Sequence, residues 1–456
     1  MGLVRDKSFY KQALAIAIPI SIQSMITIGV NLMDNIMVGS LGETVLSGTS
    51  LANQYVSIFH ICCMGIGMGT SVMTARFWGM RDLEALKKSI TLMLRFCIGL
   101  AILFTIPAIL MSPALMRLYT PDKSVIAQGI LYYRWIWPCF ILQGMSLTCT
   151  IVLRSVGQVK LPLYSSIGAF FVNIFFNYVF IFGKFGMPRM EIQGAAIGTL
   201  IARLFEFCII CGYFFLGDKR IGYRIRDIGK RCRELFWEYV NIGVPVFISD
   251  ALLALGSTAV AMIMGRISKE FVSANSITFV TQQLSTVMIQ GVCQAGCIVT
   301  GHTLGRGDKK KAQEQAWTFL LLGIIIGAFA GVIIMVISET VIGCYNIQEE
   351  TKAIARQLMA AISIIVVFQS TNSIMMKGVL RGGGDTKFLM VADILFLWVV
   401  SVPLGALAGL YWRMSAFWIY FFLKIDQVLK SFWCVFRLKS EKWMKGISGS
   451  KTEIKE

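Results

Sequence analysis

Charged side chains are scarce in this sequence. Only 15% of its 456 residues are charged, whereas 56% are hydrophobic and the mean hydropathy is +0.69. A soluble domain carries about 25% charged residues and fewer apolar ones. Apolar stretches of about 20 residues, long enough to cross a bilayer, recur from one end of the chain to the other. This composition excludes a soluble globular protein and indicates that lipid surrounds most of the chain.

The apolar stretches lack the alternation of membrane β-strands. Residues 318–337 read TFLLLGIIIGAFAGVIIMVI, whereas a strand of a membrane barrel alternates apolar and polar residues over about ten positions. A helix satisfies every backbone polar group within its own segment. The sequence therefore predicts an all-α polytopic membrane protein with about twelve spans. Their expected ranges are 12–38, 51–75, 89–112, 127–153, 163–183, 194–216, 236–262, 275–301, 313–337, 353–377, 389–410 and 414–436.

Histidine is nearly absent, and the cysteines show no metal-site or disulfide pattern. The two histidines, His60 and His302, are far apart in sequence, and Cys208 and Cys211 lie within a predicted membrane helix. Zinc sites and disulfide frameworks need defined His and Cys spacings or cysteines clustered in loops. We therefore expect no metal, no cofactor and no catalytic centre, and hence a protein that is not an enzyme.

Basic residues outnumber acidic ones, 43 to 25, which makes the net charge +18. They gather in alternate loops and at both ends of the chain, at 5–11, 76–88, 154–160, 219–233, 306–311, 381–387 and 437–455. Because cytoplasmic loops carry the excess of Lys and Arg, this pattern predicts that both termini are cytoplasmic. The charge reports membrane topology, and no nucleic-acid partner is expected.

The two halves of the chain are related by a parallel internal repeat. At one constant offset Pro19 aligns with Pro245, Gly79 with Gly305 and Asp82 with Asp308. The offset covers six predicted helices, so both halves have the same orientation in the membrane. Parallel repeats of this kind place the substrate path at their interface. The predicted organisation is a six-helix lobe at 1–216, a basic cytoplasmic linker at 217–235 and a second six-helix lobe at 236–456.

Several motifs in this frame resemble those of the multidrug and toxic compound extrusion (MATE) family. They are LMDNIMVGSLG, FWGMRD, VLRSVGQVK, VNIFFNYVFIFG, IQGAAIGTLIAR and VLRGGGDTK. The chain looks closest to the DinF-like bacterial branch. The resemblance implies a monomer in the bacterial inner membrane, in contact with lipids, with a cavity between the lobes that opens alternately to each side. It also implies exchange of small cationic amphiphilic drugs or metabolites for H⁺ or Na⁺.

Few acids fall inside the predicted spans, and Asp34 is the first of them. An ionisable residue within a membrane helix is a candidate functional residue because burying its charge is costly. Asp34 could equally be satisfied at the membrane interface. The resemblance favours a role, because the motif around Asp34 matches the family's first-helix cation site. It adds Asn173 and Asn177, where relatives often have Asn followed by Asp, and Thr199 as a hydroxyl partner. With one carboxylate, a proton fits better than Na⁺.

The second half offers its own candidates for cation or substrate binding. Asp250 lies in the seventh predicted helix, where family members carry a functional acid, and Asn372 lies where some relatives have an acid. Asp393 could be a proton site or could bond to a neighbouring helix. We expect Asp426 to pair with Lys424 or Lys430, which flank it in the sequence.

Glutamines within spans are the expected cavity-lining residues. Gln54, Gln282 and Gln283 are candidates for hydrogen bonds to a ligand, together with Gln290 and Gln294. Arg203 and Glu206, three residues apart on one predicted helix, are expected to pair with each other. An alternative function is the flipping or export of a lipid-linked or metabolite anion. That function calls for several basic residues inside the spans, and Arg203 is the main deep candidate.

Overall fold

Helices make up all of the regular secondary structure in the part of the chain that the structure describes. This computed structural model describes residues 2–343, 345 and 347–446. Within those ranges nine helices are long and apolar enough to cross a membrane, or up to eleven if each of two bent pairs is one span. The predicted all-α polytopic class is confirmed.

The long helices follow the expected spans closely. They are α1 (Lys7–Gly39), α2 (Glu43–Met80), α3 (Leu83–Leu110), α7 (Lys160–Phe182), α8 (Glu191–Gly212), α9 (Arg233–Ile267), α12 (Lys309–Gly343) and α13 (Glu349–Asn372). A π-helical turn, η1 (Tyr213–Gly217), extends α8, and another, η3 (Ser373–Leu380), extends α13. The ninth is a continuous run made of α14 (Thr386–Asp393), η4 (Ile394–Ser401), α15 (Val402–Ala406) and η5 (Leu407–Tyr411).

Three expected spans are broken. The helices α5 (Lys123–Ile136) and α6 (Cys139–Ser155) meet at 59°, and α10 (Lys269–Ser285) and α11 (Val287–Gly305) meet at 49°. Pro138 lies at the first break. Proline lacks the backbone N–H that would continue the helix, so the helix ends there. The twelfth expected span is two short helices, α16 (Ala416–Leu423) and α17 (Ile425–Lys439), and neither is among the candidate spans.

The chain divides into two compact units. Unit 1 comprises residues 1–21, 75–81 and 241–456, and unit 2 comprises residues 22–74 and 82–240. The helices α1, α2 and α9 thus contribute residues to both units. The lobe boundaries expected from the sequence stay a prediction.

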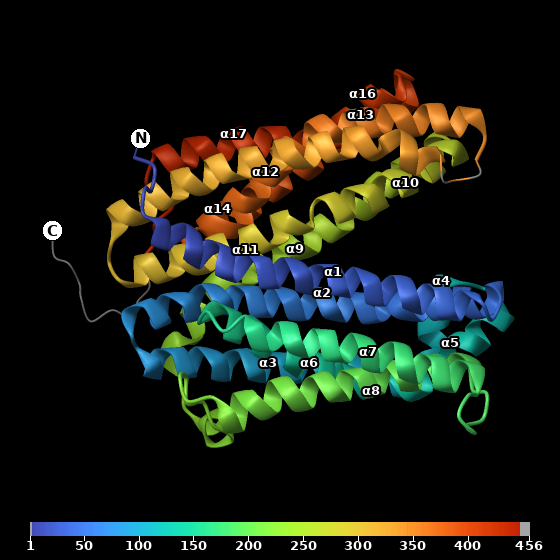
Figure 1. The fold of residues 1–456 in the computed structure, drawn as a ribbon, viewed down its shortest axis with the longest axis horizontal. Coiled ribbons are helices and arrows are strands. Elements are labelled where there is room, and N and C mark those ends of the chain that lie inside the picture. The colour runs from blue at the N-terminus through green and yellow to red at the C-terminus, as the bar shows by residue number, and fades with distance from the viewer. Residues whose placement is uncertain (1, 344, 346, 447–456) are drawn as a thin grey trace. The chain divides into compact units, whose positions relative to one another are not determined.

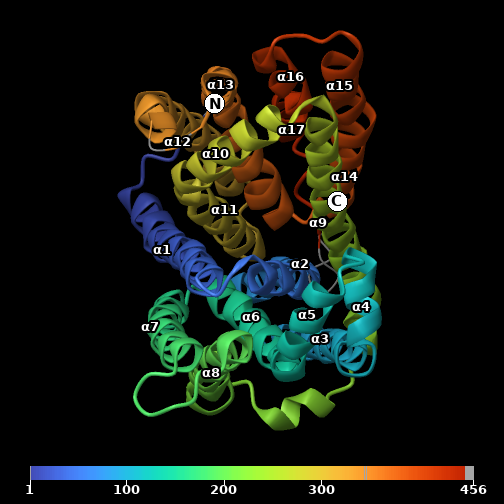
Figure 2. The same cartoon turned by 90° about the vertical axis from the view of Figure 1, so that its right-hand side faces the viewer.

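Each unit is a helix bundle whose members run roughly parallel or antiparallel (Figure 1). In unit 2 the helix α8 packs against α5, α6 and α7, and α3 packs against α6. In unit 1 the helix α13 packs against α10, α12 and α17. In Figure 2 the helices α7 and α8 of unit 2 are seen nearly end-on. The short helix α4 (Ser112–Tyr119) packs against α5 in unit 2.

Small residues allow the closest helix contacts. On α8 a Cβ at Gly194 would lie 2.6 Å from the carbonyl carbon of Phe180, and a Cβ at Gly198 would lie 3.0 Å from the Asn177 nitrogen. On α12 a Cβ at Gly327 would lie 2.7 Å from the Val367 Cα. Membrane helices associate through such small residues at four-residue spacing, because lipid offers no hydrophobic driving force.

Two glycines that the repeat aligns also meet in space. A Cβ on Gly79 would lie 3.0 Å from the Cα of Gly305, and a Cβ on Gly305 would lie 2.9 Å from the Cα of Gly79. Both glycines belong to unit 1. The equivalent ends of α2 and α11 therefore pack through the same position of the repeat.

Candidate functional site

A polar cluster in unit 2 surrounds Asp34. The Asn177 Nδ2 donates a hydrogen bond to Asp34 Oδ1 over 2.6 Å and lies 3.3 Å from the Asn173 Oδ1. Both asparagines are buried on α7, at 1% and 2% exposure, while Asp34 on α1 is half-buried. The structure thus brings together three of the four residues that the sequence predicts for cation coupling.

Gly198 makes room for this cluster. The Asn177 side chain lies against Gly198, where any Cβ would overlap its Oδ1. That Oδ1 is buried and has no hydrogen-bond partner among the described residues. The Asn177 Oδ1 is therefore an acceptor beside Asp34 that is not used in this structure.

Thr199, the fourth predicted residue, interacts with the hydroxyl of Tyr132. Tyr132 in turn lies close enough to Asp34 for the two side chains to interact electrostatically. The Tyr132 hydroxyl also donates to the Asn53 Oδ1 over 3.1 Å. Tyr132 and Asn53 lie outside the motifs of the sequence analysis. No local pattern singles them out, because each is one polar residue in an apolar helix.

Arg203 adds a positive charge near the cluster. Its guanidinium acts electrostatically on Asp34 and pairs with Glu206 over 2.8 Å. The predicted Arg203–Glu206 pair is confirmed. Arg203 thus pairs directly with Glu206 and acts on Asp34 only at a distance.

Unit 1 contains a different set of ion pairs. Asp250 on α9 lies 3.1 Å from Arg381 and 3.8 Å from Lys377. With the repeat shifted by one further residue, LRSVGQVK aligns with LRGGGDTK, so Arg381 is the counterpart of Arg154. Arg154 donates to the Gln23 amide oxygen in unit 2. Equivalent arginines thus pair with the first helix of each half, one with an amide and one with a carboxylate.

A buried group of three charges lies next to that pair. The Lys430 ammonium lies 2.8 Å from Asp393 and 3.2 Å from Asp426. Ser249 donates to Asp393 as well. The Asp426–Lys430 pair confirms the sequence expectation, whereas the pairing of Asp393 with Lys430 was not predicted.

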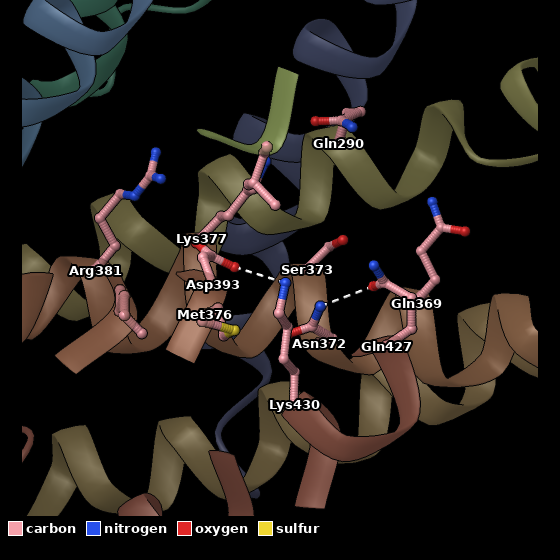
Figure 3. Close-up of a pocket in the computed structure, with 12 residues that line it drawn as sticks. Gln290, Gln369, Asn372, Ser373, Met376, Lys377, Arg381, Asp393, Gln427 and Lys430 are labelled. Carbon is pink, nitrogen blue, oxygen red and sulfur yellow. Dashed lines mark hydrogen bonds and ion pairs between the residues drawn. The ribbon is translucent and has the colours of Figure 1, made fainter. Parts of the chain in front are cut away.

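These side chains border a cavity of about 210 Å³ in unit 1, shown in Figure 3. Its lining contains three basic residues and one acid, together with four amide side chains. The charged lining residues are Lys377, Arg381, Lys430 and Asp393, and the amides are Gln290, Gln369, Asn372 and Gln427. The expectation that Arg203 is the main deep basic residue is therefore wrong. The sequence placed Lys430 beside Asp426 but gave no sign that Lys430 lines a cavity with Lys377 and Arg381.

The predicted cavity glutamines differ in position. Gln282 donates to the lining residue Gln369 over 2.6 Å, while Gln54 and Gln283 are exposed. Asn372 donates to Gln427 over 2.8 Å. Within residues 2–343, 345 and 347–446, no group of three or more His, Cys, Asp or Glu side chains could hold a metal ion.

The fold and these intramembrane charges define a polytopic membrane transporter, and comparisons with known proteins identify its family. The MatE family model matches residues 19–179 and again residues 245–407. The chain belongs to this transporter family. The double match covers both halves of the repeat.

Similar proteins cover nearly the same length. A probable multidrug resistance protein NorM of Mesorhizobium japonicum is 27% identical over 87% of this chain and 86% of its own. A solved outward-facing multidrug resistance MATE family transporter has a TM-score of 0.84 at 19% identity, covering 95% of this chain and 96% of its own. A transporter from Pyrococcus furiosus, described as having a binding pocket of reverse polarity, has a TM-score of 0.83 at 20% identity, with 95% and 96% covered.

Proposed function

We propose that this chain is a secondary active multidrug exporter of the bacterial cell membrane. It exchanges cationic amphiphilic compounds for protons, or for Na⁺, by alternating access. The names of its relatives support multidrug export. The observation that carries the coupling is the hydrogen bond of 2.6 Å between Asn177 and Asp34.

Asp34 is suited to take up a proton. An ionised carboxylate within a membrane helix is costly unless it is paired or hydrogen-bonded. Asn177 supplies one donor, and its Oδ1 is an unused acceptor. A protonated Asp34 carries a donor of its own, so proton uptake adds a possible hydrogen bond and removes a charge.

The proposed cycle uses this change of charge. A proton enters from outside and neutralises Asp34, α1 repacks against α7, and the cationic compound leaves. Release of the proton to the cytoplasm returns the transporter to its inward-open state. Each net positive charge that moves inward across about 150 mV supplies roughly 3.5 kcal/mol, enough for a gradient of a few hundred-fold.

Transport in inverted vesicles tests the proposal, with pH and sodium gradients imposed separately and a fluorescent organic cation as the substrate. We expect a pH gradient to drive uptake into wild-type vesicles and Asp34→Asn to abolish it. Glu234→Gln is the matched control, because Glu234 is a carboxylate of 83% side-chain exposure outside the cluster. Proton-driven transport by Asp34→Asn at normal expression would overturn the proposal.

Export of a lipid-linked or metabolite anion is the second candidate function. The three basic side chains that line the cavity of unit 1 favour it. Uptake of an organic anion, unaffected by the organic cation, would distinguish this function in the same vesicles.

A further inference from the structure

We propose that the cavity of unit 1 binds an oxyanion group, a carboxylate, sulfonate or phosphate, through Arg381 and Lys377. This inference goes beyond the proposed function and does not depend on it, because binding can be measured without any ion gradient. Arg381 and Lys377 lie one helical turn apart at the end of η3, and both line the cavity.

The basic side of the cavity has unused donors. Arg381 is 5% exposed, and its Nε has no hydrogen-bond partner among the described residues. The Lys377 ammonium reaches Asp250 only at 3.8 Å, beyond hydrogen-bond length. Two cations thus share one carboxylate, which leaves one positive charge and at least two donors for a ligand.

The acidic side is already satisfied. In Asp393 one oxygen accepts from Ser249 and the other lies 2.8 Å from the Lys430 ammonium. The second carboxylate on Lys430, Asp426, accepts from Gln427 over 2.8 Å. A cationic ligand would therefore have to displace existing partners, whereas an anionic ligand meets open donors.

The orientation of two neighbouring side-chain amides, those of Gln427 and Asn372, follows from their hydrogen bonds. Because a carboxylate only accepts, the Gln427 Nε2 must face Asp426, which leaves the Gln427 Oε1 to accept from the Asn372 Nδ2. The Asn372 Oδ1 is then buried without a partner among the described residues. It offers an acceptor for an N–H of the ligand.

The size of the cavity limits the ligand. An apolar cavity of about 150 Å³ holds benzene, so a cavity of about 210 Å³ has room for one ring and a small acidic group. The chemistry that fits is an aromatic amide with an attached carboxylate. Benzoylglycine is the simplest probe, and its neutral amide and N-(2-aminoethyl)benzamide are the matched neutral and cationic probes.

Isothermal titration calorimetry on the full-length protein in detergent tests the site. We expect benzoylglycine to bind more tightly than its neutral amide, and the cationic probe to bind least. Lys377→Gln should weaken the binding of benzoylglycine about tenfold, because it removes a positive charge and a charged hydrogen-bond donor from the site. Lys377 suits the test because its side chain is 44% exposed, so its loss should not prevent folding.

Asp250→Asn gives a test of opposite sign. It removes the carboxylate that competes for Arg381 and Lys377, so benzoylglycine should bind several-fold more tightly. The control is Lys352→Gln, which removes a lysine paired with Glu349 outside the cavity and should change nothing. A short-chain anionic phospholipid that displaces benzoylglycine would identify a lipid headgroup as the source of the oxyanion. Failure to displace it would indicate a soluble anion.

Two results would overturn the proposal. One is equal affinity for the anionic and neutral probes. The other is a higher affinity for the cationic probe than for benzoylglycine, lost in Asp250→Asn. That result would make Asp250 the ligand-binding group. Neither result bears on Asp34, so this inference can fail while the proposed coupling stands.

Discussion

The carboxylate of Asp393 lies 2.8 Å from the ammonium of Lys430, at a point where both side chains are nearly inaccessible. Asp426 approaches the same ammonium to 3.2 Å. The exposed fractions of the three side chains are 8% for Asp393, 1% for Lys430 and 2% for Asp426. One buried cation therefore serves two carboxylates.

Removing Lys430 should be strongly destabilising. Lys430→Met removes the ion-pair partner of two buried carboxylates, so we expect the free energy of unfolding to fall by about 3–5 kcal/mol. Asp426→Asn should cost much less, because Asp393 keeps Lys430 and the surplus negative charge disappears. Thermal unfolding of the purified variants in detergent measures both. Equal stability of the two variants would show that the three charges do not act as a group.

Asn177→Asp should alter ion selectivity. The substitution puts a second carboxylate where the Asn177 Nδ2 now donates to the Asp34 Oδ1 over 2.6 Å. The same position lies close to the Asn173 Oδ1. Hard cations favour several oxygen ligands with negative charge, so a sodium gradient should drive transport by this variant more strongly than by the wild type. Vesicle transport at fixed pH with a sodium gradient measures the change. If sodium dependence stays at the wild-type level, the cluster around Asp34 does not select the ion.

Gly198→Ala should impair transport more than stability. Its methyl group would overlap the Asn177 Oδ1, so Asn177 must move away from Asp34. Efflux of an organic cation should fall severalfold while the protein still folds, because other α7–α8 contacts remain. Gly99→Ala is the control, since nothing lies within 4 Å of a Cβ there. Normal efflux by Gly198→Ala would mean that the Asn177–Asp34 bond does not matter.

The loop between α8 and α9 should respond to acid. Burial works against ionisation of Asp227, but the Arg224 backbone N–H and the Lys230 ammonium hold its pKa below the ordinary value. A lowered pKa means that this stabilisation is present above about pH 4 and is lost as the pH falls further. Amide hydrogen exchange in residues 223–231 should therefore speed up at low pH relative to Asp227→Asn at the same pH. Identical exchange in both proteins at every pH would contradict this.

Hydropathy and the repeat predicted most of the fold. The spans at 12–38, 51–75 and 313–337 lie within α1, α2 and α12. The aligned glycines Gly79 and Gly305 also proved to be neighbours. These predictions succeed because a membrane helix must satisfy its own backbone, so its length and apolar character are encoded in consecutive residues.

The last expected span shows where such predictions fail. Residues 414–436 are apolar enough to suggest a helix, yet the segment breaks at Lys424 between α16 and α17. Its charged residues are accommodated because Lys430 pairs both with Asp426 on the same helix and with Asp393 from α14. A partner on another helix cannot be identified from the spacing within one segment.

By itself, the sequence determined that this is a helical membrane protein with a duplicated frame, and it identified Asp34 and Asn177 as candidates. The tertiary structure alone decided that Asn177 bonds to Asp34, that Tyr132 lies nearby, and that three basic residues line the cavity of unit 1. The physical reason is that contacts between helices depend on the rotation and tilt of each helix about its axis. Packing against neighbours sets that rotation and tilt, and the order of residues along one helix does not.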